Sequence, residues 1–346
     1  MNKYPLVSII MANWNGGEVY ANCLRSLSEI KYPNWELIVV DNGSTDGTSE
    51  LSLSSKFKIK NSKLIKNKLN LGFAPANNQG YKVARGKYLL LLNNDTLLEP
   101  DFLNILVEKM EKESYLGVIQ PKIKIMDNPK FLDNSGSFLT FTGFLEHWGF
   151  LKKDSGEFNQ ERLIFSAKGA CMLIRKSLVD KIGLFDNDFG SYFEETDFCW
   201  RVWLFGYKVF FYPKTFIYHK VGFTSKKQNQ LDVNFNSFKN RLCSLIKNLD
   251  LLGLLTIGLI HIFTLLFFII YYVIRLKPGW SLIILRAIGW NIVNLKKTLS
   301  KRKKVSELKK VKEKEIYKYI FKKINLSEML LHFLRSNKML SGKHSV

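Results

Sequence analysis

The sequence predicts an α/β fold built on a mostly parallel central sheet, followed by C-terminal helices at a membrane. Three observations predict this arrangement. Short, uninterrupted apolar runs alternate with helical patterns, which is typical of parallel strands covered on both faces. Polar residues directly follow three of these runs. Residues 251–274 contain no formally charged side chain, and the chain of 346 residues is long enough for a large domain with such an appendage.

The first half of the chain predicts regular strand–loop–helix alternation. The expected elements are a strand at LVSIIM (6–11), a helix over 18–30, a strand at WELIVV, a short strand over 63–66, a helix within NLGFAPANNQGYKVA and a strand at KYLLLL. Asn13, Asp41 and Asp95 each come just after a strand. Ligands of parallel sheets bind beyond the carboxyl ends of the strands, so we expect all three residues in one crevice.

The second half is less regular. We expect a helix over 101–113, whereas 115–165 shows no clear pattern. AKGACMLIRKSLVDKIGLFD predicts a strand and a short helix, and EETDFCWRVWLFGYKVFFYP predicts a helix and a strand, with Gly206 ending the helix. The first domain is expected to close near 235–250, which gives the division 1–245, 251–295 and 296–346.

Residues 251–274 predict a membrane helix. At about 1.5 Å per residue, 24 residues cover roughly 36 Å, enough for a hydrocarbon core of about 30 Å. A soluble core helix of this length normally shows a polar face. A weaker apolar stretch over 281–295 follows, and basic residues flank both stretches. The positive-inside rule then favours a hairpin, re-entrant or interfacial pair over a single crossing.

The charge of the chain is concentrated at its C-terminal end. Of the formal net charge of +22, an excess of +12 lies in 296–346, which has 16 Lys and Arg against 4 Asp and Glu. This predicts a basic tail that faces anionic lipid or nucleic acid, or one that is simply solvated. Four scattered cysteines and an N-terminal apolar run too short for a signal peptide favour a reducing, cytoplasmic location.

Three acidic segments could carry chemistry. Asp41 could accept hydrogen bonds from a nucleoside, or it could build an Asx turn. Asp95 ends the triplet Asn93-Asn94-Asp95 and offers a hard oxygen ligand for Mg²⁺ or Mn²⁺ beside substrate phosphates. Glu194, Glu195 and Asp197 predict either a base with a raised pKa or a solvated acidic helix start.

Taken together, these segments resemble the family 2 inverting glycosyltransferases, in particular their rhamnosyltransferase-like, non-processive branch. The resemblance covers roughly residues 5–245 and is carried, in order, by VSIIMANWNG, VVDNGSTDGT, NLGFAPANNQGY, KYLLLLNNDTLLEPDFL, GACMLIRKSLVDKIGLFD, YFEETDFCWRVWLFGY and YH. It implies the GT-A fold, with a Rossmann-like sheet, and transfer of a sugar from a nucleotide-diphosphate donor with the help of Mg²⁺ or Mn²⁺.

The resemblance also implies roles for single residues. The donor nucleotide would be bound by Asn13, Asp41, Asn77, Asn78 and Asn94. Asp95 would bind the metal, and His219 matches a position where some relatives add a ligand, although it could equally be an ordinary strand-end histidine. Glu195 matches the base, with Asp197 as the neighbouring candidate. This chain departs from the family pattern twice, with Asn93 in place of the first acid of the metal motif and Glu195 in place of Asp.

These inferences predict a membrane-anchored inverting glycosyltransferase on the cytoplasmic side, which transfers a hexose or deoxyhexose to a lipid-linked or other glycan. The chain lacks the QxxRW sequence of processive synthases, so we expect addition of one or a few sugars. A sugar nucleotidyltransferase is an alternative, but ANWNGGEV lacks the basic residue such an enzyme would place there. A basic, membrane-associated nucleic-acid-binding protein is the other alternative. No nucleic-acid motif is present, so no such partner is expected.

Overall fold

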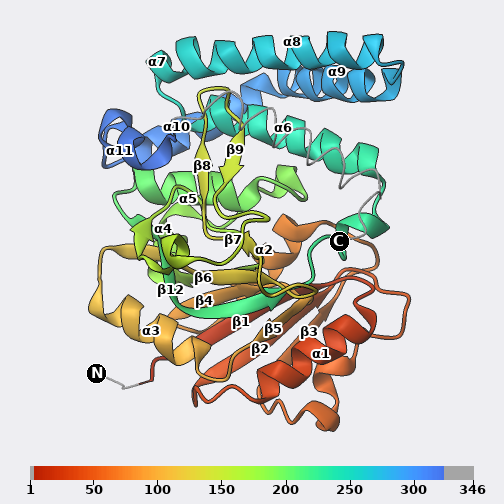
Figure 1. Ribbon diagram of the computed structural model, residues 1–346, viewed down its shortest axis with the longest axis vertical. Helices are drawn as coiled ribbons and strands as arrows, with labels where there is room; N and C mark the ends of the chain where they lie inside the picture. The colour runs from red at the N-terminus through yellow and green to blue at the C-terminus, as the bar shows by residue number, and fades with distance from the viewer. Residues whose placement is uncertain (1–3, 323–346) are drawn as a thin grey trace.

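A computed structural model of the protein describes residues 4–322 and shows a mixed α/β domain with helices stacked at one end (Figure 1). Its strands are β1 (Val7–Asn13), β2 (Trp35–Asp41), β3 (Ser62–Lys66), β4 (Tyr88–Leu92), β5 (Thr96–Leu98), β6 (Leu116–Ile125), β7 (Leu132–Asn134), β8 (Ser137–Leu139), β9 (Leu145–His147), β10 (Arg162–Leu163), β11 (Cys171–Arg175) and β12 (Lys208–His219). The strands expected in the first half of the chain are all present.

The main sheet has the order β10-β12-β6-β11-β4-β1-β2-β3, with β5 paired to β12 and β7 to β6. β1 runs parallel to β2 and β4, and β12 runs parallel to β6. β11 is antiparallel to both of its neighbours, so the sheet is mostly but not wholly parallel, as predicted. β8 and β9 form a separate two-stranded sheet.

Helices cover both faces of the main sheet. They are α1 (Gly17–Ser28), α2 (Phe73–Val83), α3 (Phe102–Lys112), α4 (Lys176–Ile182), α5 (Glu194–Leu204), α6 (Gln230–Asn248), α7 (Leu251–Gly253), α8 (Leu259–Ile274), α9 (Pro278–Val293), α10 (Leu295–Leu308) and α11 (Glu313–Ile320). Leu89 and Leu91 of β4 pack with α2, α4 and α5, whereas Leu90 and Leu92 pack with α1 and α3. An uninterrupted leucine run suits this strand because both of its faces are buried.

The region over 115–165, which showed no clear pattern, forms β6 to β10 and the turns between them. β7 pairs antiparallel with the last residues of β6. The β8–β9 hairpin reaches toward the stacked helices (Figure 1). Farther along, Gly206 adopts φ +93° directly after α5 and ends the helix, as expected.

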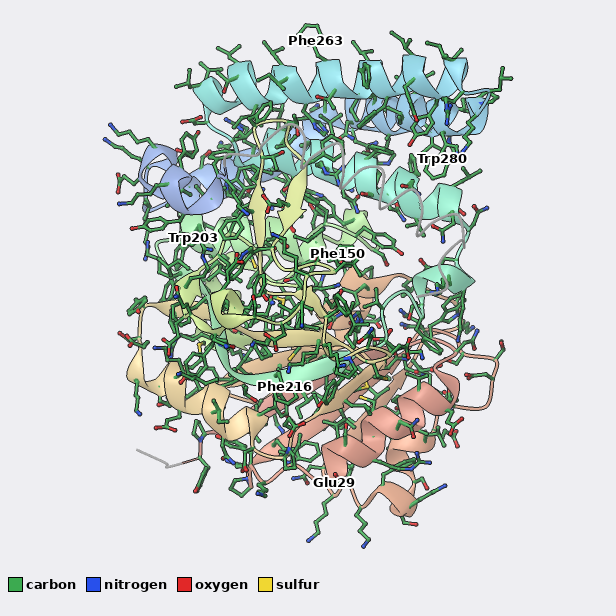
Figure 2. All side chains as sticks on the ribbon, viewed as in Figure 1. Glu29, Phe150, Trp203, Phe216, Phe263 and Trp280 are labelled. Carbon is green, nitrogen blue, oxygen red and sulfur yellow. The ribbon has the colours of Figure 1, made fainter. Side chains whose placement is uncertain are left out.

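The C-terminal helices form a hairpin beside the α/β domain. Leu251–Ile274 is continuous through α7, a π-helical turn and α8, and within the described part of the chain it is the one helix long and apolar enough to cross a membrane. α9 packs against both α8 and α6, so α8 lies along the end of the molecule (Figure 1). Phe263 is 68% exposed and points away from the domain (Figure 2).

The start of the basic tail is folded onto the domain. α10 packs on α6, where Lys297 and Lys301 pair with Asp188 at 2.7 Å and 2.6 Å. Lys301 also contacts Asp186 at 2.5 Å. α11 packs on α5 through Tyr319, which stacks on Trp203. These contacts make residues 296–322 part of the structure rather than a freely solvated tail, and the rest of the predicted tail lies outside the described residues.

Candidate active site

A cavity of about 510 Å³ opens beyond the carboxyl ends of β1 and β4. Its wall includes Asn13, Asn94, Asp95, Glu195 and His219, which are contributed by four different segments of the chain. Asn13 and Asp95 therefore line one crevice, to which the acidic start of α5 also contributes, whereas Asp41 is not among its lining residues.

Asn13 lies at the centre of the predicted nucleotide site. Its Nδ2 donates to Asp41 Oδ1 at 2.9 Å, and its Oδ1 accepts a hydrogen bond from Asn94 Nδ2 at 2.7 Å. Asn13 and Asp41 face each other in the register of the parallel pair β1–β2, which explains their contact. Asp41 also accepts hydrogen bonds from the amide and hydroxyl of Ser44, three residues on, so its carboxylate orders the loop after β2. An Asx turn would use the amide two residues on. Asp41 thus takes part both in this loop and in the polar cluster beside the cavity.

Asn77 and Asn78 lie elsewhere. Asn77 Nδ2 donates to the carbonyl of Phe73 on its own helix, and Asn78 exchanges hydrogen bonds with the backbone of Phe185. Neither side chain lines the cavity, where Asn42, Asn70 and Phe73 are found instead. Asn78 thus holds α2 against the loop that precedes α5, whereas Asn77 bonds within α2.

Asp95 and His219 form a pair at the floor of the cavity. The Nε2 of His219 lies 3.2 Å from Asp95 Oδ1, which is buried and makes no aligned hydrogen bond among residues 4–322. Neighbouring strands fix this pair, since Thr96 of β5 is in register with His219 of β12. A carboxylate oxygen and an imidazole nitrogen that converge in this way fit a divalent cation. No cluster of three such ligands occurs in the described residues, which leaves further positions for phosphate oxygens.

Asp133, which the sequence analysis missed, orients His219. Its Oδ2 lies 2.8 Å from His219 Nδ1, and Lys168 Nζ contacts both of its oxygens at 2.6 Å. Burial alone would lower the pKa of His219, but Asp95 and Asp133 raise it to about 9. Burial alone would raise the pKa of Asp133, but Lys168 and His219 outweigh it and hold that pKa far below its usual range. A carboxylate behind a ligating histidine fixes the ring and its tautomer.

Glu194 and Glu195 begin α5 at the cavity wall. Burial raises the pKa of both carboxyl groups, and the charge of Glu195 raises that of Glu194 further. The Oε2 atom of each is buried without a hydrogen-bond partner among the described residues. The preceding residues Tyr192 and Phe193 adopt φ values of +75° and +72°, an unfavourable conformation for large side chains. Such strain is typical of functional segments, and here it directs α5 at the cavity.

Asp197 does not reach the cavity. It is fully buried on the other side of α5, where it pairs with Lys247 at 3.0 Å and with Arg201 at 3.1 Å. Asn248 Nδ2 and Ser244 Oγ donate to its other oxygen. The structure therefore gives this second candidate base a structural position, which leaves Glu195 as the one of the two that faces the cavity.

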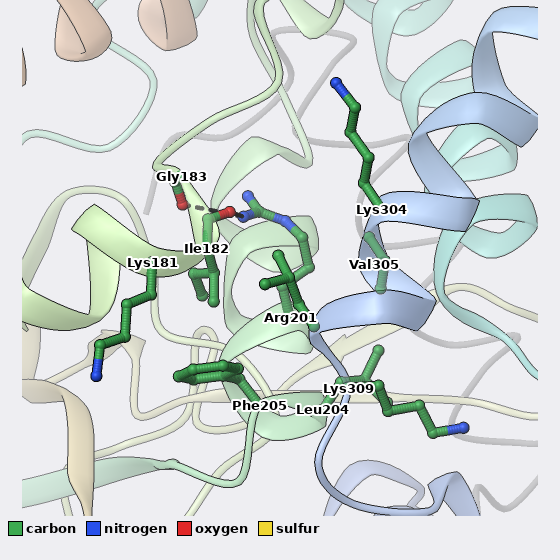
Figure 3. Close-up of a pocket in the computed structure, with 10 residues that line it drawn as sticks. Lys181, Ile182, Gly183, Arg201, Leu204, Phe205, Lys304, Val305 and Lys309 are labelled. Atoms are coloured by element: carbon green, nitrogen blue, oxygen red, sulfur yellow. Dashed lines mark hydrogen bonds between the residues drawn. The ribbon is translucent and has the colours of Figure 1, made fainter.

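A second hollow of about 290 Å³ lies between α4, α5 and α10 (Figure 3). Arg201 occupies it and donates to the carbonyls of Ile182 at 2.6 Å and Gly183 at 3.0 Å. Figure 3 shows Lys181, Lys304 and Lys309 at its edges. No carboxylate lines this hollow among the described residues, and its arginine is satisfied by backbone carbonyls and by Asp197 behind it, so it lacks the groups for acid–base chemistry.

Comparison with known proteins identifies the family and the fold. The model of the family "Glycosyl transferase family 2" matches residues 8–183. The poly-β-1,6-N-acetyl-D-glucosamine synthase of Staphylococcus epidermidis is 26% identical over 208 residues, which cover 60% of this chain and 48% of the synthase. The chain thus spans about half the length of the curated relatives it matches.

Two solved structures share the fold at low sequence identity. TarS 1–349 of Staphylococcus aureus in complex with UDP-GlcNAc has a TM-score of 0.52 and 17% identity, covering 71% of this chain and 67% of TarS. The mannosyltransferase PcManGT of Pyrobaculum calidifontis with GDP-Man and Mn²⁺ has a TM-score of 0.51 and 15% identity, covering 88% and 86%. The sheet and cavity have the predicted GT-A arrangement, and the chain belongs to glycosyl transferase family 2.

Proposed function

We propose that the protein is a membrane-attached, inverting glycosyltransferase that moves one sugar, or a few, from a nucleotide-diphosphate donor to a lipid-linked glycan. The observation that carries this proposal is Glu195, a buried carboxylate with a raised pKa in the same cavity as the Asp95–His219 pair. Family membership favours this function over the nucleotidyltransferase and nucleic-acid-binding alternatives.

The donor would lie along the strand ends. Asn13, Asn94 and the Asp41 loop offer amide and carboxylate groups to the nucleoside, and the diphosphate would extend toward Asp95. Solved structures with UDP-GlcNAc and GDP-Man share this fold, so these two sugar nucleotides are the first donors to test. In this arrangement the donor would lie opposite Glu195.

The chain's own residues would then carry the transfer. Glu195 accepts the proton of the acceptor hydroxyl, whose oxygen attacks the anomeric carbon. The bond from that carbon to the diphosphate breaks, the nucleoside diphosphate leaves, and the anomeric configuration inverts. The raised pKa of Glu195 suits a base, because a carboxylate that holds its proton more firmly is a stronger proton acceptor once ionised.

Asp95 and His219 would hold Mg²⁺ or Mn²⁺, with Asp133 behind the histidine. When bound, the cation supplies positive charge that stabilises the leaving diphosphate. His219 must be neutral to ligate, and the Nδ1 proton directed at Asp133 would leave Nε2 free for the metal. Asn93 offers the cation no carboxylate, so oxygen atoms of the donor phosphates would complete the set of ligands.

The α8–α9 hairpin would attach the enzyme to the membrane. α8 packs along α9, so lipid cannot surround it, and its outward side exposes Leu259, Phe263, Phe267 and Ile270. A helix pair with this arrangement fits the membrane interface, with the catalytic domain on the cytoplasmic side. An enzyme held there meets acceptors that are anchored in the same membrane.

A donor screen tests this function. Purified full-length protein is incubated with UDP-GlcNAc, GDP-Man and other sugar nucleotides, Mn²⁺ and membrane lipid extract, and nucleotide release is measured. The wild-type protein is expected to release nucleotide from one donor, whereas Asp95→Ala and Glu195→Gln are inactive. Absence of release from every donor, or equal rates in all three proteins, would exclude the proposal.

A further inference from the structure

Arg241 lies between the base and the membrane hairpin. It projects from α6 into the cavity wall, where its guanidinium group lies 5.4 Å from the ring of Phe193, the residue before Glu194. On its other side the guanidinium lies 4.2 Å from the ring of Phe144. Phe144 in turn contacts Phe268 of α8 at 5.8 Å. The arginine thus connects the acceptor side of the cavity to the apolar helices.

The charge of Arg241 has no anionic partner among residues 4–322. Its Nη2 donates to Ser237 Oγ at 3.3 Å, and its Nε is buried without a hydrogen bond. Burial lowers its pKa to about 10, and no carboxylate opposes that shift. Contact with two aromatic rings offsets only part of the cost of removing this half-buried ion from water.

Other enclosed cations of the described chain are paired differently. Lys122, Lys168 and Lys247 each contact a carboxylate, and Lys239, which has none, donates to the backbone carbonyl of Asp188 at 2.9 Å. Arg241 differs from all four because its hydrogen bond within residues 4–322 goes to a hydroxyl, and it lies at a cavity wall where a ligand can approach. An arginine presents a planar fork of donors that matches carboxylate and phosphate oxygens. Of these two anions, phosphate is the one that both the proposed donor and a lipid-linked acceptor carry.

Phosphate groups could enter this cavity from two sources, the donor and the acceptor. The donor diphosphate belongs with Asp95 and His219 at the strand ends. The acceptor must approach Glu195, because Glu195 takes the proton of its hydroxyl, and Phe193 joins Arg241 to that segment. We propose that Arg241 binds the phosphate group of a polyprenyl-phosphate-linked acceptor, whose lipid chain runs toward α8 and α9. This inference rests on the proposed function and specifies its acceptor.

Direct binding tests the inference without turnover. The full-length protein in detergent micelles is titrated with farnesyl phosphate and with farnesol, which share an apolar chain and differ in the phosphate. Wild-type protein is expected to prefer farnesyl phosphate. Arg241→Met keeps much of the apolar stem and should weaken farnesyl phosphate binding by tenfold to hundredfold, on the order expected for hydrogen bonds to a charged group, and leave farnesol unchanged. The affinity of Arg241→Lys for farnesyl phosphate should lie between the affinities of the wild type and of Arg241→Met.

Arg286→Met is the matched control. Arg286 is exposed on α9, lies 5.2 Å from the ring of Phe235 and does not line the cavity. Its loss should leave the preference for farnesyl phosphate unchanged. Thermal melting of each variant shows whether a loss of binding reflects unfolding, and Arg241→Lys keeps the positive charge if Arg241→Met does not fold.

A second titration with UDP and Mn²⁺ separates the two sources of phosphate. Unchanged UDP affinity in Arg241→Met supports an acceptor site. Weaker UDP binding with intact farnesyl phosphate binding would assign Arg241 to the donor and overturn the inference. The same holds if the wild type does not distinguish farnesyl phosphate from farnesol. Failure of the wild type to use any sugar nucleotide would instead count against the proposed function.

Discussion

Glu195 and Asp197 stand two residues apart on the first turn of α5, and the fold treats their carboxyl groups in opposite ways. Glu195 faces the cavity, has one oxygen without a partner and has a raised pKa. Asp197 is surrounded by Lys247, Arg201 and amide donors, which outweigh its burial and lower its pKa. Two residues turn an α-helix by about 200°, so the two side chains leave opposite faces. The comparison separates a group available for proton transfer from one that holds the helix in place.

The largest expected effect is the loss of transfer in Glu195→Gln. Removal of the proton acceptor should lower the turnover number by about a hundredfold to ten-thousandfold. The melting temperature should stay the same or rise, because the variant no longer buries a carboxyl group that lacks a full set of partners. Nucleotide release and thermal melting measure both quantities. Retention of more than a tenth of the wild-type rate would contradict the role of Glu195.

Asp197→Asn should show the opposite pattern. The change leaves Arg201 without its carboxylate and Lys247 with Asp186 alone. We expect the free energy of unfolding to fall by about 3 kcal/mol, near the lower end for breaking a buried ion pair. Denaturant unfolding measures this loss, and the turnover of the molecules that remain folded should be close to wild type. A stable but inactive variant would place Asp197 in the chemistry.

Asp133→Asn extends the comparison of buried carboxylates to the proposed metal site. The variant loses the carboxylate behind His219, so the affinity for Mn²⁺ should drop by about tenfold to a hundredfold. Titration of Mn²⁺ in the presence of UDP measures this affinity, and UDP binding without metal serves as the control. Equal Mn²⁺ affinity in both proteins would show that Asp133 does not position the ligand.

The smallest effect is a difference in pH dependence. The lowered pKa of Asp197 contributes stability that is present above about pH 4 and is lost as the pH falls through its folded value. Glu195 acts in the other direction. Its raised pKa means that the folded state keeps a proton that the unfolded state releases, so stability falls as the pH rises through that window.

The free energy of unfolding of Glu195→Gln should therefore exceed that of the wild type by more at pH 8 than at pH 4. For one proton, this difference changes by at most about 1.4 kcal/mol per pH unit. Denaturant unfolding at pH 4, 6 and 8 measures it. A difference that is constant across this range would mean that Glu195 is not buried as a destabilised carboxylate.

Local sequence patterns predicted several residues in or beside the cavity, because each pattern spans only a few positions at the end of a strand. Asn13, Asp41 and Asp95 follow strands, and parallel strands bring their ends together. Asp133 gave no such signal, because it contacts His219 from 86 positions away and lies in a region without a clear period. Asn77 and Asn78 were expected at the donor site by resemblance alone, and they do not line the cavity. A helix turns about 100° per residue, and the sequence does not say which of its faces is buried.

The sequence by itself determined the order of the strands along the chain, the polar residues at the ends of β1, β2 and β4, and the apolar helix over 251–274. Each of these features depends on neighbours only a few positions apart, where periodicity and turn residues act. Only the tertiary structure decided which acid of α5 meets the cavity and that the helix over 251–274 packs on α9. It also placed Arg241 between Phe144 and Phe193. Those facts depend on which surfaces are buried together, and that is settled by packing between distant segments.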